Sequence, residues 1–300
     1  MRPLKLSVTI ITLNESRNIE RAINSVLPFA HEIVIVDSGS IDKTIEIARS
    51  FGSKIKIFEH KFEGYGQQKS YAAQLCESDW ILNIDADEEV SEELCQSITN
   101  FIKSYGNDGS EGTDIAGMYR FARLNFHCGR PIYHGGWYPD YNIRLYNKKI
   151  VTWTAPFVHE ELKYKQDSSE DGFHRYKNIL LIVGTLNGDL YHYTFQDVDS
   201  QVKTNIKYAK LGSKKILSQF GYLEEVGEDE EYGSKINLLI KFRLILEIIF
   251  HPIIKFFECY IVKLGFLDGI HGFIIAVNAA HSIFMKYYFT YIETIECFKK

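Results

Sequence analysis

The 300-residue chain has few cysteines, little net charge and no long uninterrupted apolar run. Its five cysteines are odd in number and form no close pairs. They fit reduced thiols in a cytosolic compartment better than a disulfide framework or a zinc site. A net charge of −5 gives no electrostatic footprint for nucleic acid. The N-terminus lacks the layout of a signal peptide, so we do not expect secretion.

Apolar residues gather near the C-terminus, between Ile236 and Tyr291, but charged side chains interrupt them. The charge-free stretch 269–285 still contains His271 and Asn278. It therefore falls short of the ~18 to 20 strongly apolar residues of a spanning helix, and we do not expect one.

Within the same region, Leu238, Phe242, Ile245 and Ile249 follow helical spacing beside basic residues. This pattern favours a helix that lies in a membrane interface. The alternative is a helical pair that packs on the rest of the protein or in a homo-oligomer.

The first hundred residues alternate between strand-like and helix-like stretches. We predict strands over 6–13, 32–36, 54–58 and 80–85, and helices over 19–26, 42–48 and 67–75. Strands that alternate with helices form a parallel sheet, so the fold class is α/β. Ligands of such sheets bind at the carboxyl ends of the strands. The polar residues expected to line one crevice there are Asn14, Asp37, Lys69, Asp85 and Asp87.

Asp85 and Asp87 end the strand that starts at Trp80. Side chains at positions i and i+2 of an extended segment point to the same side, so the two carboxylates can converge on one cation. Mg²⁺ or Mn²⁺ accepts oxygen ligands and leaves positions for substrate phosphates. The alternative is an acidic turn that caps the helix beginning near Ser91.

The glycine-containing segment Gly64–Lys69 lacks the third glycine of a dinucleotide-binding fingerprint and comes too late in the chain. We interpret it as the start of a helix whose N-terminus favours anions, with Lys69 near the phosphates. An ordinary surface cation is the alternative for Lys69.

Three motifs in this order resemble glycosyltransferase family 2 with its GT-A fold: Thr12-Leu13-Asn14-Glu15, the Val36–Thr44 turn, and Ile84-Asp85-Ala86-Asp87-Glu88. The resemblance implies a sheet that binds a nucleotide sugar. It assigns Asp37 to the uracil base, and Asp85 and Asp87 to the ribose and to the metal on the diphosphate. The remaining substrate contacts expected in these motifs are Thr12, Asn14, Glu15 and Gly39. Family members more often have two adjacent aspartates where this chain has Asp37-Ser38.

Later motifs resemble the branch that contains bacterial lipopolysaccharide core glucosyltransferases. They are His134–Asp140, Arg144–Tyr146, Val158–Glu160, Tyr191–Phe195 and Gly265–Gly269. This resemblance implies inverting transfer of a hexose, with glucose the first candidate, from a UDP-hexose donor. The implied acceptor is a lipid-linked or lipopolysaccharide core saccharide at the cytoplasmic face of the inner membrane.

An inverting transfer needs a carboxylate that removes the acceptor proton. We favour Glu160, because His159-Glu160 occupies the place where many relatives carry a Glu-Asp base motif. His159 is then a substrate contact. Asp140 is expected to position an acceptor hydroxyl or to pair with Arg144, and an exchange of the two carboxylates' roles is the alternative.

Four further side chains are candidates, each with a structural alternative. Trp137 and Tyr138 suit stacking on a sugar ring but could only pack a loop. His192 is a candidate metal ligand or a core histidine. Arg144 could clamp a phosphate, orient a carboxylate or be a solvated charge.

We expect a catalytic domain over 1–223, with a nucleotide-binding half over 1–103 and an acceptor half over 114–223, followed by an amphipathic helical region over 235–300. Two other function classes stay open. One is a non-catalytic nucleotide-sugar-binding membrane scaffold. The other is a sugar-phosphate nucleotidyltransferase, which would normally carry a Gly-rich basic loop where this chain has Asn14-Glu15-Ser16.

Overall fold

The computed structural model describes residues 4–105, 114–154, 161–165, 175–176, 179–219 and 230–297. The chain forms two compact units, and each is discontinuous in sequence. The first comprises Met1–Leu124 and Pro139–His192, and the second comprises Asn125–Tyr138 and Tyr193–Lys300. Strands β6 (Asp114–His127) and β12 (Ile179–Phe195) each contribute residues to both units.

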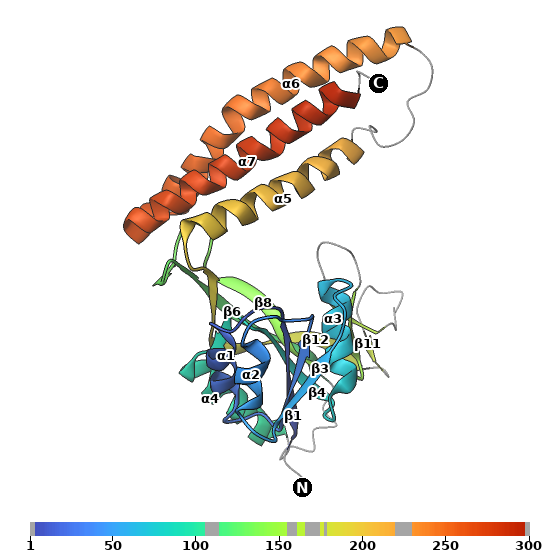
Figure 1. Ribbon diagram of the computed structural model, residues 1–300, viewed down its shortest axis with the longest axis vertical. Coiled ribbons are helices and arrows are strands. Elements are labelled where there is room, and N and C mark those ends of the chain that lie inside the picture. The colour runs from blue at the N-terminus through green and yellow to red at the C-terminus, as the bar shows by residue number, and fades with distance from the viewer. Residues whose placement is uncertain are drawn as a thin grey trace. The chain divides into compact units, whose positions relative to one another are not determined.

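A parallel core forms the centre of the first unit (Figure 1). Its order is β3–β2–β1–β4, with β1 at Leu6–Thr12, β2 at Glu32–Asp37, β3 at Ile55–Glu59 and β4 at Trp80–Asp85. The connecting helices are α1 (Ile19–Val26), α2 (Thr44–Arg49) and α3 (Tyr65–Leu75). Helical crossovers between parallel strands are the arrangement that the alternating sequence predicts. The α/β class is confirmed.

Beyond β4 the sheet becomes antiparallel. The order continues from β4 through β8 (Asp140–Asn147), β6 and β12 to β11 (Arg175–Tyr176). The short strand β5 (Glu88–Val90) follows β4 closely in sequence and pairs with β12. Strands β9 (Val151–Trp153) and β10 (Leu162–Tyr164) form a separate small sheet.

Both faces of the central sheet are covered, which explains why its strands are apolar throughout. Helices α1, α2 and α4 (Glu92–Tyr105) lie on one face and α3 lies on the other (Figure 1). Val8 and Ile10 of β1 pack into the core cluster of α1, while Val34 and Val36 of β2 pack with Ala72 of α3. This packing fixes the strand ends that carry the candidate site.

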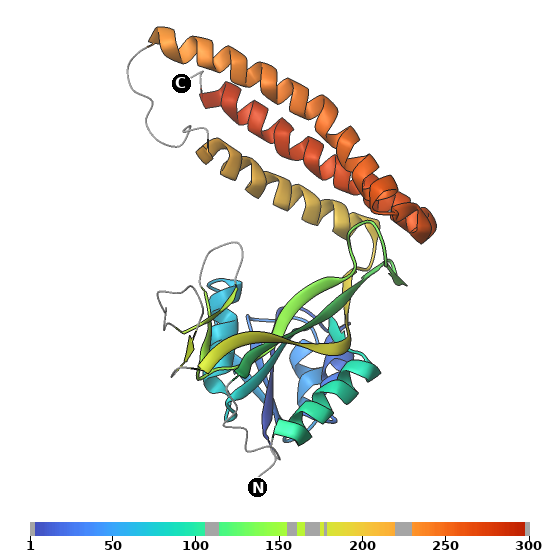
Figure 2. The same ribbon diagram turned by 180° about the vertical axis from the view of Figure 1, so that it is seen from behind.

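The second unit contains helices α5 (Val198–Gln219), α6 (Glu230–Phe257) and α7 (Gly269–Cys297), with β7 (Arg130–Pro131). The helices lie side by side, and α7 contacts both α5 and α6 (Figure 2). A π-helical turn, Glu258–Val262, and a 3-10 turn, Gly265–Asp268, join α6 to α7. A Cβ on Gly272 would lie 1.8 Å from the carbonyl oxygen of Gly265, so the backbones touch here and require glycine.

Many apolar side chains of α6 and of the turn after it are exposed, among them Phe242, Ile254 and Val262. In the described part of the chain one helical segment, Gly265–Thr294, is long and apolar enough to cross a membrane by length and composition, with 22% of its most apolar window buried. The polar side chains of this segment, such as His271 and Asn278, weigh against such a span. Interfacial attachment of this region stays a prediction.

Candidate donor-binding site

Thr12, Asp37 and Asp85 stand at the ends of three adjacent parallel strands. In the register of β1 with its neighbours, Thr12 pairs with Asp37 and Ile11 pairs with Asp85. The carboxyl ends of parallel strands meet at one edge of a sheet. The structure therefore places these three residues at one edge, as the sequence predicts.

Hydrogen bonds lock the loop after β1 to the loop after β2. The N–H of Asn14 donates to Ser40 Oγ (2.8 Å), and Asn14 Oδ1 accepts the N–H of Ile41 (2.9 Å). The N–H of Glu15 donates to Thr44 Oγ1 (2.8 Å). Asn14 has a positive φ of 57°, which asparagine tolerates better than most residues. Asn14 thus joins the two loops, and its contact with substrate stays a prediction.

The Asp37 carboxylate is engaged by its own loop. Its Oδ2 accepts the N–H groups of Gly39 (2.9 Å) and Ser40 (2.8 Å), and its Oδ1 accepts the Ser40 hydroxyl. Gly39 has a φ of +96°, which a residue with a side chain rarely adopts. Asp37 and Gly39 together fix this turn, so the loop has its shape without a ligand.

Glu88 closes the turn that carries Asp85 and Asp87. Its Oε2 accepts the N–H of Asp85 (2.9 Å), while its Oε1 binds Arg144 Nη2 and lies 3.5 Å from Arg123 Nη1. Glu88 is fully buried. A buried carboxylate persists when it is paired and hydrogen-bonded, and both conditions are met here.

Two cations hold the Asp85 side chain. Arg144 Nη2 lies 2.8 Å from Oδ2, and Lys69 Nζ lies 3.5 Å from Oδ1. Burial alone would raise the pKa of Asp85, but Arg144 and Lys69 keep this pKa well below its usual range. Lys69 and Arg144 are only 4% and 5% exposed, so the alternatives of a surface cation and a solvated charge are wrong for these residues.

Asp87 faces His192. Strand β12 brings His192 opposite Glu88, and His192 Nε2 lies 3.4 Å from Asp87 Oδ2. A carboxylate and an imidazole suit a divalent ion that takes further ligands from a diphosphate and from water. The two Asp85 oxygens are already occupied by cations. Among the described residues, no group of three or more His, Cys, Asp or Glu side chains is arranged to hold a metal. The residues therefore fit an ion held by Asp87 and His192 that is completed by the ligand.

Glu15 adds a further carboxyl group beside this pair. Burial raises its pKa, and the negative charges of Asp87, Asp42 and Asp85 raise it further. A cation bound at Asp87 would reduce this repulsion.

A cavity of about 470 Å³ borders Asp85. Arg123, Trp153 and Glu161 are among the lining residues that the sequence did not predict. Trp153 lies beneath the ammonium group of Lys69, which is 5.1 Å from the centre of its ring. Glu161 directly follows the predicted base Glu160, and this adjacency was the available signal for it. No pattern in the sequence marks Arg123 or Trp153.

Asp140 pairs with Arg123 rather than with Arg144. Its Oδ2 accepts hydrogen bonds from Arg123 Nη2 (2.7 Å) and Nε (3.0 Å), and Arg144 binds Asp85 and Glu88 instead. The expected Asp140–Arg144 pair is therefore wrong. Strand β6 aligns Arg123 directly opposite Asp140 of β8, which explains the partner.

Four further predicted residues are not part of this described site. Glu160 and His159 fall outside the described residues. Trp137 and Tyr138 belong to the second unit, where the Trp137 ring lies near His127 and Phe195 and Tyr138 lies near Tyr133. In the same unit His134 Nδ1 lies 3.1 Å from Asp268 Oδ1, which joins two of the late motifs.

Comparison with known proteins adds to this geometry. The family model for Glycosyl transferase family 2 matches residues 7–149. An uncharacterized glycosyltransferase of Rickettsia bellii is 31% identical over 94% of this chain and 84% of its own length. The lipopolysaccharide core biosynthesis glycosyltransferase LpsC of Rhizobium meliloti is 27% identical over 94% of this chain and 90% of its own length. The crystal structure of Staphylococcus aureus TarS 1-349 in complex with UDP-GlcNAc aligns with 99% of this chain and 92% of that chain, at 15% identity and a TM-score of 0.43.

Proposed function

The chain belongs to glycosyltransferase family 2, and we propose that it moves a hexose, with glucose the first candidate, from a UDP-sugar to a lipid-linked or lipopolysaccharide core saccharide. The similarity to LpsC along 94% of the chain supports this acceptor class. The choice of UDP rests on the resemblance of Asp37, Asp85 and Asp87 to the family motifs. We propose a single displacement with inversion at the sugar carbon.

The observation that carries this proposal is the set of charges around Asp85. Two buried cations, Lys69 and Arg144, meet this carboxylate at the sheet edge where the strand-end loops are preformed. Burying a charged side chain costs free energy unless it is paired in a fixed geometry. Such buried charged groups cluster at functional sites. Lys69 also lines the cavity, so its ammonium group can stabilise the negative charge that develops on the departing nucleoside diphosphate.

The proposed metal is Mg²⁺ or Mn²⁺. Asp85 was expected to share in holding it with Asp87, but both oxygens of Asp85 face cations, so we propose Asp87 and His192 as the ligands. When bound, such an ion supplies Lewis-acid stabilisation of the leaving diphosphate. The chain's own part is positional: Glu88 fixes the backbone of the turn, and Arg144 fixes the Asp85 side chain beside the ligands. This arrangement keeps Asp85 in place before the donor arrives.

For the acceptor step we propose Glu160 as the base. Asp140 is the alternative, but its Oδ2 already accepts two hydrogen bonds from Arg123. A carboxylate clamped in this way suits the orientation of an acceptor hydroxyl better than the removal of its proton.

We further propose that the protein attaches to the cytoplasmic face of the inner membrane through α6 and the turn after it. Exposed apolar side chains of Phe242, Phe250 and Ile254 support this, because an isolated apolar surface of this kind is costly in water. Attachment would bring the enzyme to a lipid-linked acceptor.

Family membership makes the protein a glycosyltransferase, so the nucleotidyltransferase and the non-catalytic scaffold are set aside. The proposed donor and acceptor are tested with UDP-glucose, UDP-galactose, UDP-N-acetylglucosamine and GDP-mannose, each with lipopolysaccharide-containing membrane extract. We expect labelled sugar to enter the extract from a UDP-hexose only when Mn²⁺ or Mg²⁺ is present. Transfer from GDP-mannose alone would overturn the donor assignment, and equal transfer by Asp85→Asn would overturn the site.

A further inference from the structure

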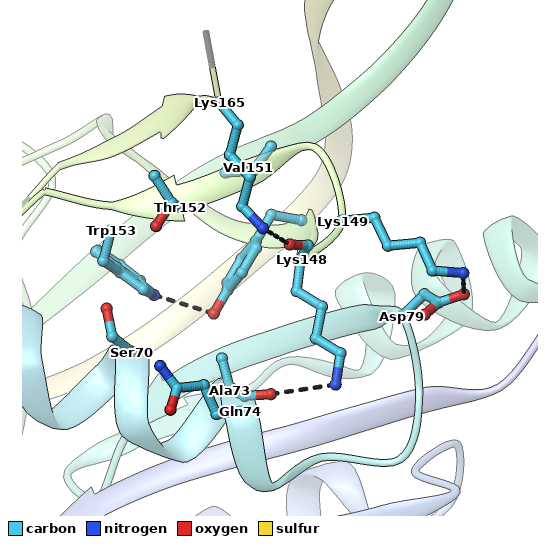
Figure 3. A pocket seen from close by; sticks show the side chains of 11 residues that line it. Ser70, Ala73, Gln74, Asp79, Lys148, Lys149, Val151, Thr152, Trp153 and Lys165 are labelled. Carbon is cyan, nitrogen blue, oxygen red and sulfur yellow. Dashed lines mark hydrogen bonds and ion pairs between the residues drawn. The ribbon is translucent and has the colours of Figure 1, made fainter. Parts of the chain in front are cut away.

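A second cavity, of about 560 Å³, lies between α3 and the turn that joins β8 to β9 (Figure 3). Three lysines line it, Lys148, Lys149 and Lys165, together with the hydroxyl groups of Ser70 and Thr152. The volume falls within the range of small-molecule sites, roughly 300–1,000 Å³. None of the residues predicted to act in catalysis or donor binding lines this cavity in the described part of the chain.

Among the described lining residues, the lysines outnumber the carboxylates and give a net positive charge. Lys148 Nζ donates to the carbonyl oxygens of Ala73 and Cys76 at the end of α3, and Lys165 Nζ donates to the carbonyl oxygen of Lys148 (2.6 Å). Carbonyl oxygens carry no net charge, so these bonds hold the ammonium groups without neutralising them. Among the described residues that line the cavity, Asp79 is the only carboxylate, and it pairs with Lys149 (2.6 Å).

Trp153 connects this cavity to the one beside Asp85, because its side chain lines both. Its Nε1 donates to the Tyr146 hydroxyl (3.0 Å), which fixes the ring (Figure 3). A flat, oriented indole is a good surface for a sugar ring. A saccharide that lies along Trp153 can therefore reach the lysines with one end and the reacting centre with the other.

We propose that the lysine cavity binds a phosphate or carboxylate group carried by the acceptor saccharide. This inference rests on the proposed function, since it assigns the acceptor of the same reaction. Ammonium groups pair with both kinds of anion, and the neighbouring hydroxyls of Ser70 and Thr152 can donate to their oxygens. The cavity thereby selects acidic saccharides as acceptors.

The test compares glucose, glucose 6-phosphate, glucuronate and inorganic phosphate by ligand-observed NMR with the full chain. We expect at least one of the two anionic sugars to bind in competition with phosphate, and glucose to bind at least tenfold more weakly. The variants Lys149→Met and Lys165→Met should each weaken the anionic sugars by about tenfold, the size expected for a charge-assisted hydrogen bond. Lys103→Met, a change at an exposed lysine of α4, is the matched control and should change nothing.

Lys148 is not substituted, because its ammonium group binds the carbonyl oxygens of Ala73 and Cys76 at the C-terminal end of α3. Its loss would disturb the local fold as well as the charge. Equal binding of glucose and of the anionic sugars would overturn the inference, as would unchanged binding in both lysine variants. Binding of UDP with Mn²⁺ is measured on the same samples. If UDP fails to bind, the proposed function fails; if UDP binds normally and the lysine variants have no effect, only the acceptor inference fails. A phosphate-specific or carboxylate-specific response identifies which anion the acceptor carries.

Discussion

Glu88 holds Asp85 at two points. Its Oε2 accepts the Asp85 backbone N–H at 2.9 Å, and its Oε1 binds Arg144, which also grips the Asp85 side chain at 2.8 Å. The fully buried Glu88 carboxylate therefore fixes the backbone of the turn at Asp85 and, through Arg144, the orientation of the Asp85 side chain.

We predict that Glu88→Gln impairs both stability and activity. The substitution leaves Arg144 and Arg123 with one negative partner fewer in a buried place, so the free energy of unfolding should fall by about 3 kcal/mol. Denaturant unfolding measures this. The control is Glu89→Gln, because Glu89 makes a partly exposed ion pair with Arg21 worth less than about 1 kcal/mol. Equal stability of the two variants would contradict the role of Glu88.

Asp87→Ala should abolish metal-dependent turnover and remove the effect of Mn²⁺ on UDP affinity. His192→Ala should weaken the Mn²⁺ dependence in the same direction, because His192 lies beside Asp87. Calorimetry of UDP binding with and without Mn²⁺ checks both. If UDP binds Asp87→Ala with an undiminished metal response, the metal lies elsewhere.

Glu160→Gln should lower turnover by about 10² to 10⁴, the contribution of a general base, and leave UDP binding intact. Asp140→Asn should mainly raise the acceptor KM, because Asp140 is held by Arg123. Steady-state kinetics of the two variants separates the roles. The reverse pattern would show that Asp140 is the base.

Membrane attachment should depend on the exposed apolar residues of α6. The double variant Phe250→Ser, Ile254→Ser replaces side chains that are 55% and 63% exposed. We expect its partition into anionic phospholipid vesicles to fall by about tenfold or more. The matched control changes Tyr208 and Leu211, two exposed residues of α5, to serine. Equal losses in both double variants would argue against a specific attachment surface.

His127 should make the protein less stable in mild acid. It is fully buried, with Nε2 3.0 Å from Gln201 Oε1 and Nδ1 3.3 Å from His271 Nδ1, and burial lowers its pKa. The unfolded chain then takes up a proton more readily, near pH 6.5. Stability from this group is present above that pH and is lost as the pH falls toward the pKa of the folded state. The Tm should fall when the pH is lowered from 7.5 to 5.5. This fall should be smaller in His127→Gln and unchanged in His31→Gln.

The sequence predicted the parallel half of the fold well, because strands such as 6–12 and 32–37 are buried on both faces and read as continuous apolar runs. The antiparallel half was harder to predict. Strand β12 contains Gly184 and Gly188 among polar residues, and its place beside β6 follows from pairing over a long separation.

The same difference appears in the candidate site. Residues that follow a strand end, such as Asp37 and Asp85, could be placed at one edge from spacing alone. Arg123 and Trp153 could not, since each reaches the site through strand pairing that no local pattern encodes. For this reason the sequence predicted Arg144 as the partner of Asp140, whereas the partner is Arg123. Arg144 is four residues away in sequence, but Arg123 lies directly across the ladder.

The division of the chain has a consequence for any attempt to separate its two units. Residues 125–138 leave the first unit, join the helices and return, so His134 meets Asp268 only when both distant stretches are present. Cutting the chain after residue 192 would remove Asp268 and the helices, and would leave residues 125–138 without the rest of their unit. A single cut therefore does not separate the two units, because each of them is built from two stretches of the chain.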